Sequence, residues 1–125
     1  MMDQTKEPQK RSDFRSGLSY PIWYRDLHEG GPGGEWARTS TRDLSGGGSS
    51  FDLVDGGRLE RRTGDMLEIQ VILPPTPVFA IGRVVRVFQD ERGCLWAGVM
   101  FVSIAPKDKD RIVRVVLNEG LERSW

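Results

Sequence analysis

A series of short β-like runs, each ended by a turn signal, is the feature that most constrains the fold of this chain. The clearest run is MLEIQVIL (66–73), where every second residue from Leu67 to Leu73 is aliphatic and the polar Glu68 and Gln70 lie between them. This period of two is typical of a strand with one buried face. We expect strands at 18–27, 36–44, 49–54, 66–73, 78–88 and 94–104.

The segments between these runs carry glycine, proline and charged residues. HEGGPGGE (28–35) is read as a hairpin loop, and PPTP (74–77) ends the strand before it. Strict alternation in 36–44 places Thr41 and Asp43 on the same side of that strand. In VFAIGRVVRVF (78–88), two adjacent valines interrupt the alternation, which indicates either a β-bulge or burial on both faces.

The period changes from two to that of a helix after the last run. Ile112 and Val116 recur at helical spacing, Pro106 suits a first helical turn, and Gly120 suits a helix end. Six strands followed by one helix predict an all-β fold, a small antiparallel barrel whose terminal helix covers an open end or an apolar outer face. The chain has 125 residues, which suits one such domain.

Composition limits the possible functions. There are 18 basic and 18 acidic residues, so the formal net charge is zero and a general nucleic-acid binder is disfavoured. One cysteine and one histidine disfavour a disulfide, a thiolate or histidine metal site, and a catalytic triad. Residues 1–16 are polar, so we expect a flexible arm there and the folded domain over 17–125. The chain shows no signal peptide or membrane-spanning run, so we expect no membrane insertion and a cytoplasmic location.

The segment TRDLSGGGSS (41–50) is the first candidate for chemistry. Asp43 offers two acceptor oxygens that suit the adjacent N–H donors of guanine, and Ser45 offers a donor for a phosphate or carbonyl oxygen. The glycines have no side chain to block a ligand. The alternative is a glycine-rich turn in which Asp43 and Ser45 bond their own backbone.

The second candidate is the cationic arm KRSDFR, with Lys10, Arg11 and Arg15. A guanidinium group can donate two parallel hydrogen bonds to phosphate oxygens, can hydrogen-bond guanine, and can stack on a purine ring. The Arg-x-x-x-Arg pattern occurs three times in the chain, but only the first copy lies on an arm that could fold over a barrel. The alternative is a solvated basic arm with no fixed role.

Together these segments resemble the PilZ domain family, whose pattern is an Arg-x-x-x-Arg arm followed by Asp/Asn-x-Ser-x-x-Gly on a strand pair. The segments GDMLEIQVILPP, IGRVVRV and AGVMF add to the likeness, which covers roughly residues 10 to 121. The resemblance implies a six-stranded antiparallel β-barrel with a C-terminal helix that binds the bacterial second messenger cyclic di-GMP. The ligand-binding roles it implies fall on Arg11, Arg15, Asp43, Ser45 and Gly48, flanked by Lys10, Arg42, Gly46 and Gly47.

The resulting hypothesis is a non-enzymatic receptor that rearranges its N-terminal arm on binding and then meets a protein partner not identified by the sequence. We expect no catalytic residue, metal or cofactor beyond the ligand. The alternative is a PilZ-like adaptor that binds no nucleotide and acts through protein contacts in motility or pilus assembly. A third possibility, a barrel that binds single-stranded nucleic acid, needs exposed aromatic residues on a basic face. We expect no nucleic-acid binding, because tryptophan and tyrosine at strand positions are expected in the core.

Overall fold

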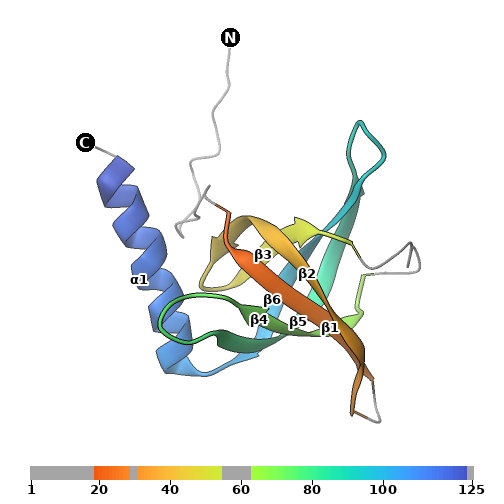
Figure 1. Cartoon of the computed structure of the whole chain (residues 1–125), viewed down its shortest axis with the longest axis horizontal. Helices are drawn as coiled ribbons and strands as arrows, with labels where there is room; N and C mark the ends of the chain where they lie inside the picture. The colour runs from red at the N-terminus through yellow and green to blue at the C-terminus, as the bar shows by residue number, and fades with distance from the viewer. Residues whose placement is uncertain (1–18, 29–30, 55–62, 124–125) are drawn as a thin grey trace.

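A computed structural model describes residues 19–28, 31–54 and 63–123 of the chain (Figure 1). Its elements are β1 (Pro21–His28), β2 (Gly31–Ser45), β3 (Gly48–Asp52), β4 (Met66–Val71), β5 (Val78–Gln89), β6 (Leu95–Ile104) and α1 (Pro106–Arg123). The strands close into an antiparallel barrel in the order β1-β2-β3-β6-β5-β4. The predicted fold class, six antiparallel strands in a barrel followed by a helix, is therefore confirmed.

The barrel interior is filled by the apolar side of each strand. Leu67, Ile69 and Val71 of β4 are buried, as their alternation predicts. Tyr24 and Phe51 are also fully buried, with ring centroids 5.1 Å apart. The buried Tyr24 hydroxyl accepts a hydrogen bond from the backbone N–H of Val54 at 2.8 Å. Each large apolar side chain buried here stabilises the barrel by about 1.5–3 kcal/mol.

Helix α1 covers one end of the barrel, and the β1–β2 and β5–β6 hairpins project away from it (Figure 1). Ile112 and Val116 are buried in the core, as the helical spacing predicts. Arg111 ties the helix to the β4–β5 loop by donating hydrogen bonds to the carbonyl oxygens of Leu73 and Pro74, at 3.3 Å each, and to that of Thr76. The prediction that Gly120 ends the helix is wrong, because α1 continues to Arg123.

The predicted hairpin loop at 28–35 is also wrong, because β2 already begins at Gly31. His28 pairs with Gly31 and Leu27 pairs with Pro32, so most of the glycine-rich segment belongs to the strand ladder. Strand pairing uses backbone groups, and a hairpin of two neighbouring strands can therefore extend through residues whose side chains favour loops.

Two β-bulges change which face of the barrel the later residues of β2 and β5 occupy. Thr41 pairs with Phe51 and Asp43 with Ser50, so Arg42 is an extra residue in β2. Thr41 is buried, whereas Asp43 lies on the outer face, so the expectation that Thr41 and Asp43 share a side is wrong. A bulge adds one residue to one strand only, and this reverses the alternation beyond it.

The second bulge lies in β5, at the predicted interruption. Val84 pairs with Val99 and Arg86 pairs with Gly98, so Val85 is the extra residue. Val84 is fully buried and Val85 is 40% exposed, which confirms a bulge and excludes burial on both faces. Beyond this bulge Arg86 lies on the outer face, where strict alternation from Val84 would have turned it inward.

The expectation of aromatic residues in the core holds for Tyr24 but is wrong for the tryptophans that the structure describes. Each is half-buried on the outer face and carries an arginine guanidinium over its ring. The pairs, with distances from the guanidinium carbon to the ring centroid, are Arg38 over Trp23 (4.5 Å), Arg25 over Trp36 (4.3 Å) and Arg42 over Trp96 (4.6 Å).

Candidate ligand-binding site

A hollow of about 480 Å³ lies on the outer face of the barrel over β2, β3, β6 and β5. We name it the motif slot and define it by Asp43, Ser50, Gly98 and Arg86, which form one row across these strands. Asp43 pairs with Ser50, Ser50 with Gly98, and Gly98 with Arg86. Because Gly98 and Ser50 are small, the middle of the row is low, and the charged side chains stand at its two ends.

Trp96 forms one wall of the motif slot, two residues before Gly98 on β6. Its ring stacks on Phe88 of β5, with centroids 4.0 Å apart and planes 16° apart. Met100, two residues after Gly98, lines the opposite wall and is 43% exposed. Because the side chains of β6 alternate between the two faces, Trp96 and Met100 form two walls of the motif slot. Gly98 between them leaves the floor without a side chain.

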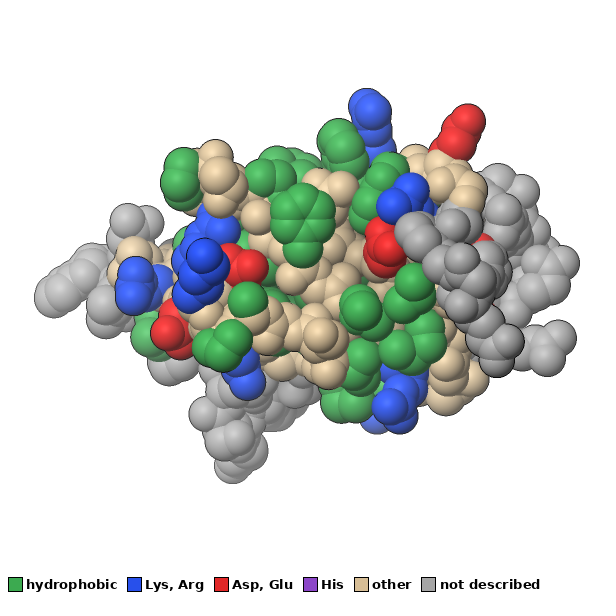
Figure 2. Space-filling view, turned by 90° about the horizontal axis from the view of Figure 1, so that it is seen from below, with side chains coloured by type: hydrophobic (Ala, Val, Ile, Leu, Met, Phe, Trp, Pro, Cys, Tyr) green, Lys and Arg blue, Asp and Glu red, His purple; other side chains and the backbone are tan. Residues whose placement is uncertain are grey.

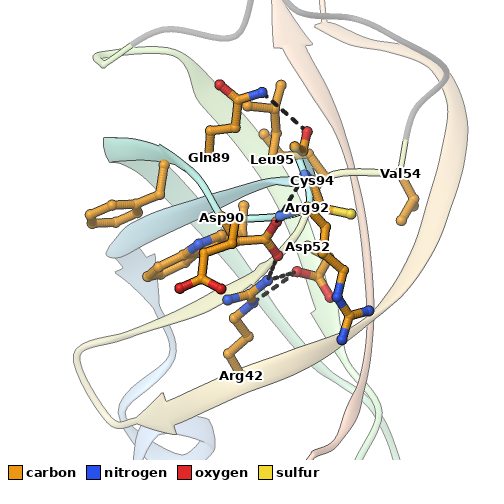
Figure 3. Close-up of a pocket in the computed structure, with 13 residues that line it drawn as sticks. Arg42, Asp52, Val54, Gln89, Asp90, Arg92, Cys94 and Leu95 are labelled. Carbon is orange, nitrogen blue, oxygen red and sulfur yellow. Dashed lines mark hydrogen bonds and ion pairs between the residues drawn. The ribbon is translucent and has the colours of Figure 1, made fainter.

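Arg42 holds the Trp96 wall from the side of β2, as Figure 3 shows for its ion pairs. Its Nη2 atom lies 2.7 Å from Asp52 Oδ1 and 3.3 Å from Asp90 Oδ2. Burial disfavours the charge of Arg42, but the hydrogen bonds and ion pairs with Asp52 and then Asp90 outweigh this and raise its pKa. Its guanidinium is therefore occupied by two carboxylates and an aromatic ring.

A larger hollow, of about 960 Å³, lies on the other side of the Trp96 and Phe88 pair and is drawn in Figure 3. Asp90 in its wall accepts backbone N–H bonds from Cys94 at 3.0 Å and Arg92 at 2.9 Å. These bonds, that of Cys94 first, hold the pKa of Asp90 below its usual value, and Arg42 adds to the effect. The Asp90 carboxylate thus fixes the β5–β6 turn. These contacts account for the charged groups of the larger hollow as parts of the turn structure.

Ser45 is held by bonds to the backbone of the turn, as the turn interpretation expects, whereas Asp43 is held by the backbone of the paired strand β3. The N–H of Ser50 donates to Asp43 Oδ1 at 3.1 Å. Ser45 Oγ accepts from the N–H of Gly47 at 3.2 Å and donates to the carbonyl oxygen of Gly48 at 3.4 Å. Both residues also line the motif slot, and Ser45 is only 1% exposed. The backbone bonds therefore fix polar groups at the edge of the hollow.

The three glycines of the motif have different surroundings. A Cβ atom at Gly48 would lie 2.2 Å from the carbonyl oxygen of Val99 on β6, so glycine is required there for strand pairing. A Cβ atom at Gly46 would lie 2.8 Å from Val113 Cγ2 on α1, so this glycine lets the helix approach. At Gly47 the nearest heavy atom would be Ser45 Oγ at 4.0 Å. Only Gly47 of the three leaves open space beside the turn.

The structure brings together part of the predicted site. Asp43, Ser45, Gly47 and Gly48 line the motif slot, Gly46 faces α1, and Arg42 lines the neighbouring hollow. Lys10, Arg11 and Arg15 lie outside the described residues.

Sequence reasoning missed the aromatic wall and Arg86. Two signals for them were available in the sequence. A glycine follows Trp96 by two residues, and an arginine precedes Phe88 by two residues, just beyond the predicted bulge.

Two further features are absent from the described ranges 19–28, 31–54 and 63–123. They contain no group of three or more histidine, cysteine, aspartate or glutamate residues placed to hold a metal ion. No helix within them is long and apolar enough to span a membrane.

Comparisons with known proteins agree with this architecture. The family model described as PilZ domain matches residues 9–118. No curated protein matches the chain. The structure of the Bacillus subtilis inhibitor of motility MotI/DgrA has a TM-score of 0.77 at 21% identity, covering 94% of this chain and 54% of that one.

Two structures with cyclic di-GMP are also similar. The PilZ domain of YcgR from Escherichia coli with c-di-GMP has a TM-score of 0.60 at 17% identity, covering 93% of this chain and 98% of that one. The K. pneumonia MrkH–c-di-GMP complex has a TM-score of 0.68 at 20% identity, covering 94% of this chain and 54% of that one. This chain thus spans about half the length of the MotI/DgrA and MrkH chains, and at these identities the likeness shows the fold alone.

Proposed function

This chain belongs to the PilZ domain family, and from that premise we propose that it is a non-enzymatic receptor for cyclic di-GMP. The observation that carries the proposal is the motif slot, where the fixed Asp43 carboxylate and the Trp96 wall border one hollow. Similar structures that contain cyclic di-GMP, among them those of the YcgR PilZ domain and MrkH, support the choice of ligand. A cytoplasmic location belongs to the same proposal.

The chemistry of each group suits a guanine dinucleotide. Asp43 accepts from the adjacent N–H donors of a guanine edge, and the aromatic wall gives the base an apolar neighbour. Ser45 keeps the turn in shape and presents its oxygen at the edge of the slot. Arg11 and Arg15 of the arm bind phosphate oxygens and guanine atoms. Lys10 flanks them as a further phosphate contact.

The free energies are sufficient for useful affinity. Micromolar binding needs about 8 kcal/mol. Charge-assisted hydrogen bonds contribute about 1.5–3 kcal/mol each, and stacking of arginine on a ring adds about 0.5–2 kcal/mol. Two arginines with Asp43 and Ser45 supply on the order of 10 kcal/mol before the cost of ordering the arm and the ligand is subtracted. The margin over about 8 kcal/mol is small once these costs are subtracted, so we expect binding in the micromolar range that depends on both Arg11 and Arg15.

The arm provides the output of the proposed receptor. Ligand binding orders residues 1–16 against the barrel and creates a surface for a protein partner. Hydrogen exchange measured with and without cyclic di-GMP tests this step. We expect slower exchange over residues 8–17 with the ligand, and unchanged exchange there would exclude arm ordering as the signal.

Arg15→Ala tests the role of the arm in binding. We expect an affinity for cyclic di-GMP at least about tenfold weaker by isothermal titration calorimetry, because a charge-assisted contact is lost. Arg38→Ala is the matched control, since Arg38 belongs to another Arg-x-x-x-Arg copy and lies over Trp23, outside the motif slot. Equal affinities of the two variants would contradict the proposed role of the arm.

The adaptor alternative is favoured by the apolar side chains exposed on the barrel, some of which Figure 2 shows in green on the face seen from below. Phe79 of β5 is 58% exposed and Val102 of β6 is 38% exposed. Such residues suit a protein contact. A thermal-shift panel of cyclic dinucleotides separates the two functions, because an adaptor is stabilised by none of them and the receptor by cyclic di-GMP.

The surface tryptophans with their arginines also meet one requirement of a single-stranded nucleic-acid binder. Against this function, Arg25 is already paired with Glu68, with Arg25 Nη2 3.0 Å from Glu68 Oε1, and the formal net charge of the chain is zero. A short oligonucleotide belongs in the same thermal-shift panel. Stabilisation by the oligonucleotide and not by cyclic di-GMP would replace the receptor function with this one.

A further inference from the structure

Arg86 is a cation of the motif slot whose charge is not balanced by a carboxylate of the residues that the structure describes. Among the described residues, no acidic group lies within ion-pair distance of its guanidinium, and the guanidinium carbon lies 5.9 Å from the centroid of the Phe88 ring. Arg42 on the other side of the aromatic wall is held by two carboxylates instead. An exposed guanidinium that lines a hollow and lacks an internal partner is available to an anion.

The position of Arg86 depends on the bulge at Val85. Without the extra residue, Arg86 would have the same orientation as Val84, which is fully buried. With the bulge, Arg86 lies opposite Gly98 on the outer face. Bulges are frequent next to functional sites, where they redirect a side chain. The bulge at Arg42 does the same for Asp43, so both charged ends of the motif slot face outward because of an added residue.

The two ends of the slot carry opposite charges at a separation that suits a nucleotide. Asp43 on β2 and Arg86 on β5 are three strand spacings apart, which places their backbones about 14 Å apart along the sheet. Both side chains extend over the low floor at Ser50 and Gly98 and shorten this span. A carboxylate accepts from base N–H groups and repels phosphate, while a guanidinium attracts phosphate. The slot therefore favours one orientation of a nucleotide, with its base at Asp43 and a phosphate at Arg86.

We propose that Arg86 forms an anion-binding subsite of the motif slot that takes a phosphate group of the nucleotide whose base lies at Asp43. The inference rests on the proposed function, since it assigns a further contact to the same ligand. The Phe88 ring centroid lies 5.9 Å from the guanidinium carbon, close to the outer limit of a cation–π contact, so this contact leaves the guanidinium donors open to an anion. Lysine could supply the charge at this position but not the planar pair of donors.

The test compares Arg86→Ala with Arg83→Ala by calorimetry with cyclic di-GMP. Arg83 is the matched control because it is an exposed arginine on the same strand and outer face, outside the motif slot. Both variants change the net charge equally. We expect the Arg86→Ala affinity to be at least about tenfold weaker and the Arg83→Ala affinity to stay within about twofold of wild type. Arg86→Lys should fall between Arg86→Ala and wild type.

The outcomes separate this inference from the function on which it rests. Wild-type protein that releases no heat and gains no thermal stability with cyclic di-GMP would overturn both. Wild-type binding with equal affinities for Arg86→Ala and Arg83→Ala would overturn the subsite alone. The melting temperatures of the two variants are compared without ligand as a control. If they are equal, a lower affinity of Arg86→Ala reports a lost ligand contact and not a damaged barrel.

Discussion

Alanine at Gly48 is expected to destabilise the barrel strongly, whereas alanine at Gly47 leaves its stability close to wild type. The added Cβ atom at position 48 would lie 2.2 Å from the carbonyl oxygen of Val99, so β3 and β6 would have to separate. Overpacking costs about 1–3 kcal/mol and occasionally more. The obstacle here is backbone, so we expect about 3 kcal/mol and a melting temperature lower by about 10 °C.

Thermal and urea unfolding of three alanine variants, at Gly46, Gly47 and Gly48, measures this difference. Gly46→Ala should be intermediate, because the added atom meets the side chain of Val113, which can move, at 2.8 Å. At Gly47 the nearest atom of the described residues, apart from its two chain neighbours, would be Ser45 Oγ at 4.0 Å, so this variant separates ligand binding from stability. We expect Gly47→Ala to weaken cyclic di-GMP binding while the fold is retained. A Gly48→Ala variant as stable as Gly47→Ala would show that strand pairing does not require the glycine.

The sequence predicted the barrel well where one side-chain period matches one buried face. The alternation from Leu67 to Val71 corresponds to burial in β4 residue by residue. It failed at the β1–β2 hairpin, where Gly31 and Pro32 belong to the ladder although their types favour loops. Strand pairing there depends on the backbone and on the neighbouring strand, and local side-chain preference does not report either.

The candidate site was only partly predictable, for a related reason. Asp43 and Ser45 belong to one short motif and can be recognised from it. Phe88, Trp96 and Arg86 come from two later strands, and they reach Asp43 only because β6 pairs with β3 and with β5. Their alignment also requires the exact register and both bulges, since one residue more or less moves a side chain to the other face. The bulge in β5 was predicted, but its effect on Arg86 needed the strand order.

Asp43→Ala is expected to cause the largest loss of ligand affinity that leaves the protein folded. Removing the carboxylate takes away the acceptor for the guanine edge, and we expect affinity for cyclic di-GMP to fall at least about thirtyfold. The same change leaves the N–H of Ser50 without the Asp43 Oδ1 acceptor that lies 3.1 Å from it. An unsatisfied buried donor costs about 1–3 kcal/mol, so stability in urea should fall by about that amount. Calorimetry and urea unfolding measure the two effects.

Two further variants distinguish the structural effect of Asp43 from its effect on the ligand. Asp43→Asn keeps an oxygen that can accept from the N–H of Ser50, so its stability should return to wild type and its affinity should exceed that of Asp43→Ala. Asp110→Ala removes the same charge from an exposed position on α1 and should leave affinity unchanged. If Asp43→Ala binds cyclic di-GMP as tightly as Asp110→Ala, the carboxylate serves only the backbone of β3. The base would then have to be recognised by a residue other than Asp43.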